Sequence, residues 1–213
     1  LDKRVQADIN QTLGELQKGY SNDPVVQVRA RLTHAQSLVK SGDPALAKKL
    51  TDEALTQLGE LDQFFSAAVS LQVASQLREL GQAQASDALL KNCVEVYGDD
   101  PLVMQGIAKQ TADPDILGAA SEAIDLNRQG VRSYQMGRFA DALALFRQAL
   151  QHQPKNISIA LNTAQSLLRL GGDQPDEALL DECRRCLQAV RMLPPSDPRH
   201  ARYQQLHNKA FGP

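Results

Sequence analysis

The stretch AIDLNRQGVRSYQMGRFADALALFRQALQHQP, residues 123–154, carries the clearest fold signal in this chain. It contains two helical patterns, and Gly137 separates them. Gly130, Ala142 and Ala149 stand where larger side chains would bury more area. Two antiparallel helices approach closely only where the residues at their crossing are small. The stretch therefore predicts a tightly packed helical hairpin.

The same spacing of small residues recurs elsewhere in the chain. Aligned on Gly42, Gly81, Gly137 and Gly171, the residues seven positions earlier are Ala35, Ala74, Gly130 and Ala164. Five positions after the first three glycines lie Ala47, Ser86 and Ala142, and twelve positions after them lie Ala54, Cys93 and Ala149. Each hairpin leaves an apolar face that the next hairpin must cover. The repeats predict an all-α superhelical solenoid of antiparallel helix pairs.

Helical periodicity covers most of the chain, and no sustained strand pattern interrupts it. We expect helices over residues 2–18, 25–41, 44–58, 62–80, 84–97, 102–110, 139–152, 157–170, 177–192 and 198–209. A further long helical stretch should run from the break at residues 111–115 to Met136. Ser196 is the expected N-cap of the last helix.

Composition agrees with close-packed helices and excludes several classes of partner. Hydrophobic residues make up 42% of the 213 residues, aromatic residues make up 4%, and the formal net charge is −2. This charge provides no basic field for nucleic acid or an anionic membrane. No apolar run approaches the roughly 20 residues that a membrane helix needs. Since the chain starts at Leu1 without Met or a signal peptide, we expect it to be a piece of a longer protein.

Residues 123–154 resemble the tetratricopeptide repeat, a 34-residue motif of two helices. Its characteristic positions 4, 8, 17, 20, 24, 27 and 32 fall on Leu126, Gly130, Phe139, Ala142, Phe146, Ala149 and Pro154. The sequence departs from the motif at Leu126, where Trp is usual, and at Gln129 and Ser133. The resemblance implies three parts. Residues 1–97 hold an N-terminal helix and two degenerate repeats, 98–122 form a non-repeat helical insert, and 123–213 hold a well-matched repeat, an extended repeat and a capping helix.

A second resemblance concerns the order of these parts. Degenerate repeats, one good repeat, NISIALNTAQSLLRL at 156–170 and LPPSDPRHARYQQL at 193–206 are similar to helical C-terminal regions of bacterial response regulators. This similarity implies the cytoplasmic output or regulatory part of a two-component signalling protein. The alternative is a stand-alone scaffold or assembly factor, for which the cell envelope, and with it the periplasm, is one option.

No catalytic or metal-binding constellation is recognisable in the sequence. Cys183 and Cys186 form a lone C-x-x-C in a helical stretch, without the further ligands that zinc needs. His200 and His207 are expected on a solvated face, and His34 in a helix contact. We therefore expect no enzyme activity, no metal and no cofactor.

The tetratricopeptide resemblance implies that the first helix of each pair lines a concave groove for a protein or peptide partner. Carried over by repeat position, the polar groove residues are Gln36, Lys40, Gln72, Ser75, Arg78, Glu79, Asn127, Arg128, Tyr134, Gln135, Asn162, Gln165 and Arg169. We expect Asn127, Arg128, Asn162, Gln165 and Arg169 to converge, with their polar ends in solvent. The alternative is an ordinary solvated helix face. One subfamily clamps a C-terminal carboxylate with a defined set of residues, and only Asn162 fits that set.

Overall fold

A computed structural model describes residues 23–61, 65–172 and 176–212, and within these ranges the chain is helical with no strand. The helix expected at residues 2–18 lies outside the described residues. The chain divides into two compact units. Unit 1 comprises residues 1–65 and 69–89, and unit 2 comprises residues 66–68 and 90–213. The division cuts two helices, after residue 68 and after residue 89, and each unit is described by itself.

Unit 1 is built on the helix pair α2 (Pro24–Ser41) and α3 (Pro44–Glu60), which pack against each other, followed by α4 (Ala67–Glu79) from residue 69 onward and the first half of α5 (Ala83–Tyr97). Ala35, Leu38 and Ala47 form a buried cluster between α2 and α3. Ser86 is also buried, and its hydroxyl donates to the carbonyl oxygen of Ala74 at 2.8 Å. The small residues therefore lie at helix contacts in this unit, as predicted.

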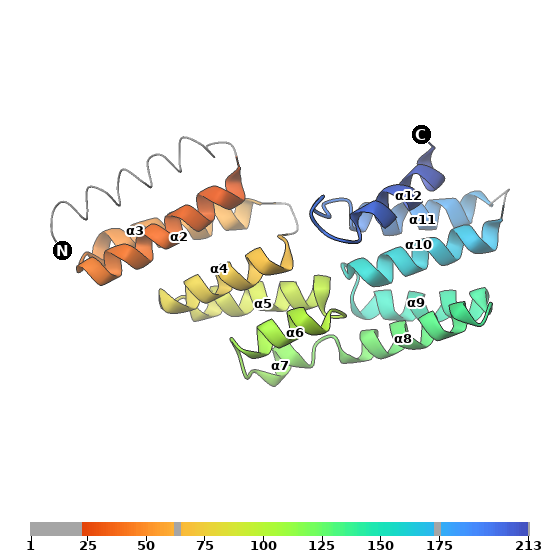
Figure 1. Cartoon of the computed structure of the whole chain (residues 1–213), viewed down its shortest axis with the longest axis horizontal. Helices are drawn as coiled ribbons and strands as arrows, with labels where there is room; N and C mark the ends of the chain where they lie inside the picture. The colour runs from red at the N-terminus through yellow and green to blue at the C-terminus, as the bar shows by residue number, and fades with distance from the viewer. Residues whose placement is uncertain (1–22, 62–64, 173–175, 213) are drawn as a thin grey trace. The chain divides into compact units, whose positions relative to one another are not determined.

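Unit 2 contains the rest of α5, then α6 (Pro101–Ala108), α7 (Pro114–Leu117), α8 (Ser121–Gln135), α9 (Phe139–His152), α10 (Ile157–Gly171), α11 (Glu177–Ala189) and α12 (His200–Phe211). From α8 to α12 each helix packs against the next, and α10 also contacts α8 and α12 (Figure 1). The first helices α8, α10 and α12 thus lie side by side, which confirms the all-α solenoid of helix pairs that the sequence predicts.

Most helices begin and end at residues whose own chemistry favours a helix end. Four helices, α2, α3, α6 and α7, begin with an Asp N-cap followed by Pro, at Asp23, Asp43, Asp100 and Asp113. The Asp carboxylate satisfies free N–H groups, and Pro at this position lacks an N–H that would need a partner. The turns that follow α2, α4 and α8 contain Gly42, Gly81 and Gly137 with φ of 87°, 77° and 75°, a conformation that favours glycine.

Three local predictions were wrong. The repeat alignment places Gly171 among the helix-breaking glycines, but Gly171 is the last residue of α10, and Gly172 has the positive φ instead. The long stretch to Met136 is broken at residues 118–120, between α7 and α8. Ser196 is not the N-cap of α12, because the helix begins at His200 and its N-cap residue is Arg199. In the turn before it, the carboxylate of Asp197 accepts from the backbone N–H of Arg199 at 2.8 Å.

Gly130 of α8 lies directly against the ring of Phe146 of α9. A Cβ atom at this position would lie 2.5 Å from Cε1 of Phe146, which no real Cβ tolerates. The ring of Phe146 is buried, and Ala142 and Ala149 on the same helix are also buried. The missing side chain of Gly130 therefore provides the space into which the aromatic ring packs.

Gly130→Ala is expected to lower the free energy of unfolding by about 1–3 kcal/mol, because the new methyl group overpacks the contact with Phe146. The matched control is Gly59→Ala in α3, where a Cβ atom meets nothing within 4 Å. That control should be neutral or stabilising by up to about 1 kcal/mol. Urea unfolding of both variants checks this, and equal effects would contradict the assigned contact.

Candidate functional site

Five side chains from α8, α10 and α12 form a hydrogen-bonded row, here called the amide row. Asn162 Nδ2 donates to Asn127 Oδ1 at 2.8 Å, and Gln165 Nε2 donates to the hydroxyl oxygen of Tyr134 at 3.1 Å. Arg202 of α12 donates through one nitrogen, Nη2, to Asn162 Oδ1 at 2.8 Å and to Gln165 Oε1 at 2.5 Å. The row therefore joins three first helices across one surface of unit 2.

Arg202 sets the direction of every hydrogen bond in the amide row. A guanidinium group only donates, so the amide oxygens of Asn162 and Gln165 must turn towards it. Their NH₂ groups then face away, towards Asn127 and Tyr134. Burial lowers the pKa of Arg202, an effect that the nearby Tyr134 opposes. The cation is thus partly desolvated, and its partners are neutral.

Two cavities open along the amide row. The larger, about 790 Å³, is lined by Tyr134, Gln135, Gly137, Phe139, Gln165, Leu168, Arg169, Gly172, Leu206 and Lys209. The smaller, about 330 Å³, is lined by Val131, Tyr134, Gln135, Phe146, Asn162, Gln165 and Arg202. Because Tyr134, Gln135 and Gln165 line both, the two cavities adjoin. They provide concave space beside the only polar network that crosses α8, α10 and α12 within the described residues.

Aromatic rings connect Arg169 to this surface. The guanidinium of Arg169 lies 5.4 Å from the centre of the Phe139 ring, within the range of a cation–π contact. The rings of Phe139 and Tyr134 meet edge to face at 5.0 Å. Arg169 is exposed, so its charge lies at the edge of the larger cavity.

The structure brings together six of the seven groove residues predicted from residue 127 onward, namely Asn127, Tyr134, Gln135, Asn162, Gln165 and Arg169. The convergence predicted for Arg128 was wrong. Arg128 is exposed, forms an ion pair with Asp125 at 3.4 Å, and lines a different cavity with residues of α6 and α7. The expectation of solvent-facing polar ends holds for the exposed Arg128 and Arg169. It fails for the three amides, because Asn127 is only 7% exposed and Arg202 provides a partner for Asn162 and Gln165 inside the row.

The groove residues predicted in unit 1 form a separate set of contacts. Gln36 of α2 donates to Glu79 of α4 at 2.6 Å, and Gln76 donates to Gln36 Oε1 at 3.2 Å. Arg78 forms an ion pair with Asp87 of α5. The remaining predicted residues are Lys40 and Gln72, which are exposed, and Ser75, which is half-buried. This surface links α2 to α4 but holds no buried, unneutralised cation among its predicted residues.

Arg202 is the site residue that the sequence analysis missed. The capping helix α12 was not assigned a groove position, because the repeat register ends near Pro194. Arg202, Leu206 and Lys209 are spaced four and three residues apart, which places them on one helix face. That spacing around the buried Leu206 is the signal that would have found both cations.

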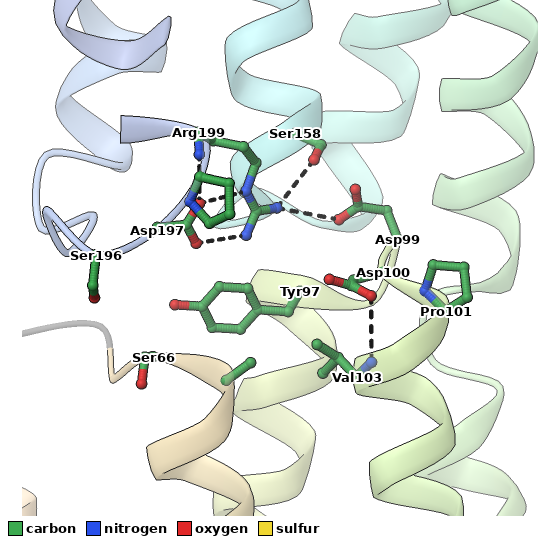
Figure 2. Close-up of a pocket in the computed structure, with 12 residues that line it drawn as sticks. Ser66, Tyr97, Asp99, Asp100, Pro101, Val103, Ser158, Ser196, Asp197 and Arg199 are labelled. Atoms are coloured by element: carbon green, nitrogen blue, oxygen red, sulfur yellow. Dashed lines mark hydrogen bonds and ion pairs between the residues drawn. The ribbon is translucent and has the colours of Figure 1, made fainter. Parts of the chain in front are cut away.

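A further cavity of unit 2, of about 540 Å³, surrounds Arg199 (Figure 2). The guanidinium forms two hydrogen bonds with Asp197, at 2.9 and 2.8 Å, and a third with the hydroxyl of Ser158 at 3.1 Å. It lies 3.9 Å from Asp99 and 5.3 Å from the centre of the Tyr97 ring. The loop before α12 is thereby joined to the end of α5 and the start of α10.

The positive charge of Arg199 is balanced by the carboxylates of Asp197 and Asp99, whereas Arg202 has only neutral partners among the described residues. Burial alone would lower the pKa of Arg199, but hydrogen bonds and attraction from Asp197 outweigh it, and the pKa is raised. Burial likewise opposes the ionisation of Asp197, yet hydrogen bonds from Arg199 hold its pKa below the usual value. Burial, followed by the charge of Asp197, raises the pKa of Tyr97. These contacts explain how the start of α12 is held in place, and the charge of Arg199 is balanced by residues of the chain itself.

Cys183 and Cys186 are buried free thiols of α11. Burial raises the pKa of Cys183 to about 11 and that of Cys186 to about 12. Within the described ranges no group of three or more His, Cys, Asp or Glu side chains is placed to hold a metal ion. No helix in the same part of the chain is long and apolar enough to cross a membrane.

Comparison with known proteins found two family matches. A family profile described as tetratricopeptide repeat matches residues 133–210, and a second, described as tetratrico peptide repeat, matches residues 29–109. The second match includes part of the segment 98–122 that we predict to be an insert, and that prediction remains untested. No curated protein matches the sequence.

Asn162→Ala is expected to lower the free energy of unfolding by about 1–3 kcal/mol, because Asn127 loses a donor and the partly desolvated Arg202 loses an acceptor. The control is Asn208→Ala, an exposed position of α12, which should change stability by less than about 0.5 kcal/mol. Urea unfolding at neutral pH measures both. Equal stability of the two variants would show that the amide row contributes nothing.

The two buried thiols should make stability fall at alkaline pH. A thiol in the unfolded chain ionises near pH 9, whereas Cys183 and Cys186 stay protonated to higher pH in the fold. Their contribution is therefore complete below pH 9 and is lost as pH rises towards 11 and 12. From pH 9 to pH 10 we expect a loss of about 1 kcal/mol for each thiol.

The variant carrying both Cys183→Ala and Cys186→Ala should lose this part of the pH dependence while the cavity penalty stays the same at every pH. Unfolding free energies at several alkaline pH values measure the difference between the variant and the natural chain. Parallel curves for the two proteins would contradict the assignment.

Proposed function

Because the chain belongs to the tetratricopeptide-repeat family, whose repeats form protein–protein interaction modules, we propose that it binds its partner on the surface shared by α8, α10 and α12. The single observation that supports this surface is the amide row with its two adjoining cavities. We propose a protein or peptide as partner, and neither catalysis, a cofactor nor nucleic acid as part of the function.

The groups on this surface suit a polypeptide. Gln135 is exposed and lines both cavities, so its amide can donate to and accept from a partner backbone. Phe139 and Leu168 line the larger cavity and offer apolar contact beside the amides. A bound segment would thus meet both kinds of contact that peptide recognition uses.

In its biological setting, we propose that the module is the cytoplasmic output or regulatory part of a bacterial two-component response regulator. The order of degenerate repeats, one good repeat and the ending at 193–206 supports this role. The alternative is a stand-alone scaffold or assembly factor, for which the periplasm is one option. The gene sequence upstream of the Leu1 codon separates them: a receiver domain in the same reading frame supports the first role, and a signal peptide supports the second.

Gln135→Trp should abolish partner binding, because it places a large ring where the two cavities adjoin and leaves the five residues of the amide row unchanged. Gln148→Trp is the matched control, since Gln148 is also exposed but lies on the second helix α9. Pull-downs from the source organism, with captured proteins identified and quantified by mass spectrometry, compare the two variants with the natural chain.

We expect the proteins captured by the natural chain to be retained by Gln148→Trp and lost with Gln135→Trp. Melting temperatures establish that both variants are folded. Retention by Gln135→Trp together with loss in Gln148→Trp would place the binding surface on the second helices and overturn the proposal.

A further inference from the structure

We infer that the surface of α8, α10 and α12 binds an acidic peptide segment, with at least two carboxylate side chains near each other, and that Arg202, Arg169 and Lys209 receive them. This inference rests on the proposed function, because it names the chemistry of the partner at the same surface. Three observations support it: the unneutralised charge of Arg202, two more cations along the adjoining cavity, and the absence of acidic residues among the described residues that line either cavity.

Arg202 has N–H groups that donate to no acceptor in the part of the chain that the structure describes. Both of its hydrogen bonds leave from Nη2, and within the described residues no acceptor is placed against Nε or Nη1. Its two partners are neutral amides, so its charge is not balanced by them. Burial disfavours the charged form and lowers the pKa of Arg202, which means that a carboxylate arriving there would relieve an existing electrostatic cost.

Arg169 and Lys209 extend the same charge into the larger cavity. Arg169 reaches it from α10 and Lys209 from α12, and both side chains are exposed. In the described part of the chain neither has an ion-pair partner. Since Tyr134, Gln135 and Gln165 line both cavities, a carboxylate at Arg202 and another at Arg169 or Lys209 can belong to one bound segment.

The number of cations favours a run of acidic side chains over a single chain terminus. One terminal carboxylate neutralises one cation, whereas three cations are spread over two adjoining cavities. The whole chain has a formal net charge of −2, so no overall field draws in an acidic peptide. Binding of such a peptide must therefore depend on these local charges.

The probe is a fluorescent hexaglutamate peptide with both ends blocked, and the control peptides are blocked hexaglutamine and hexaglutamine with a free carboxyl end. Fluorescence anisotropy at low ionic strength measures the affinity. We expect hexaglutamate to bind, blocked hexaglutamine not to bind, and the affinity for hexaglutamate to fall as salt is added.

Arg202→Gln should weaken hexaglutamate binding at least about tenfold, because it removes the charge and keeps an amide donor for the row. The matched control is Arg185→Gln, an exposed arginine of the second helix α11, which should change the affinity less than about twofold. Should Arg202→Gln fail to fold, the variant carrying Arg169→Gln and Lys209→Gln provides the same test, since both positions are exposed.

Three outcomes would overturn the inference. These are no binding of hexaglutamate, equal weakening by Arg185→Gln and Arg202→Gln, and binding of free-ended hexaglutamine as tight as that of blocked hexaglutamate. If any occurs while Gln135→Trp still abolishes partner capture, the proposed function stands and only the acidic chemistry is wrong. If hexaglutamate binds as expected but Gln135→Trp leaves partner capture intact, the native partner binds elsewhere.

Discussion

The contact between the backbone of Gly130 and the ring of Phe146 is the constraint on which the rest of unit 2 depends. It lets α8 lie closer to α9 than any side chain at Gly130 would allow. Since α10 packs on α9 and beside α8, the depth of this contact sets the position of one first helix relative to the next. The 2.8 Å hydrogen bond between Asn127 and Asn162 requires that placement, so a packing contact in the core controls the polar surface.

Arg199 and Arg202 are three residues apart, but their guanidinium groups have different electrostatic surroundings. Arg199 is surrounded by Asp197, Asp99 and Ser158, and its charge is balanced within the fold. Arg202 has only neutral oxygens as partners. A buried charge without an opposite charge beside it lowers the stability of the fold, and such charges are found mainly at sites of binding or catalysis. The first arginine anchors α12, and the anchored helix presents the second to the amide row.

Much of the fold could be predicted from the sequence, because helix pairs with small residues at their crossings leave a periodic signal. The turns at Gly42, Gly81 and Gly137 follow from the same period. The break at residues 118–120 could not be predicted, since LGAASEA favours a helix by local propensity. There Ala120 is 1% exposed, and its Cβ lies 2.8 Å from where a Cβ of Gly98 would be. Packing against a distant segment thus overrides local preference.

The candidate site was predicted only in part for a related reason. Repeat positions identified Asn127, Asn162 and Gln165, which lie on helices that follow the repeat period. Arg202 lies beyond the last matched position, so the period carries no information about it. Whether an amide faces solvent or a neighbour depends on Arg202, and this is why the predicted exposure of Asn127 was wrong.

Glycine is required at positions 130 and 137 for unrelated physical reasons, and the difference determines which substitutions each position can accept. At Gly130 the obstacle to a side chain is another residue, so a smaller side chain in place of Phe146 can restore room. At Gly137 a Cβ atom would meet nothing within 4 Å, and the obstacle is the handedness of its own backbone. Gly130 should therefore covary with position 146 among related sequences, whereas Gly137 should change independently of every other position.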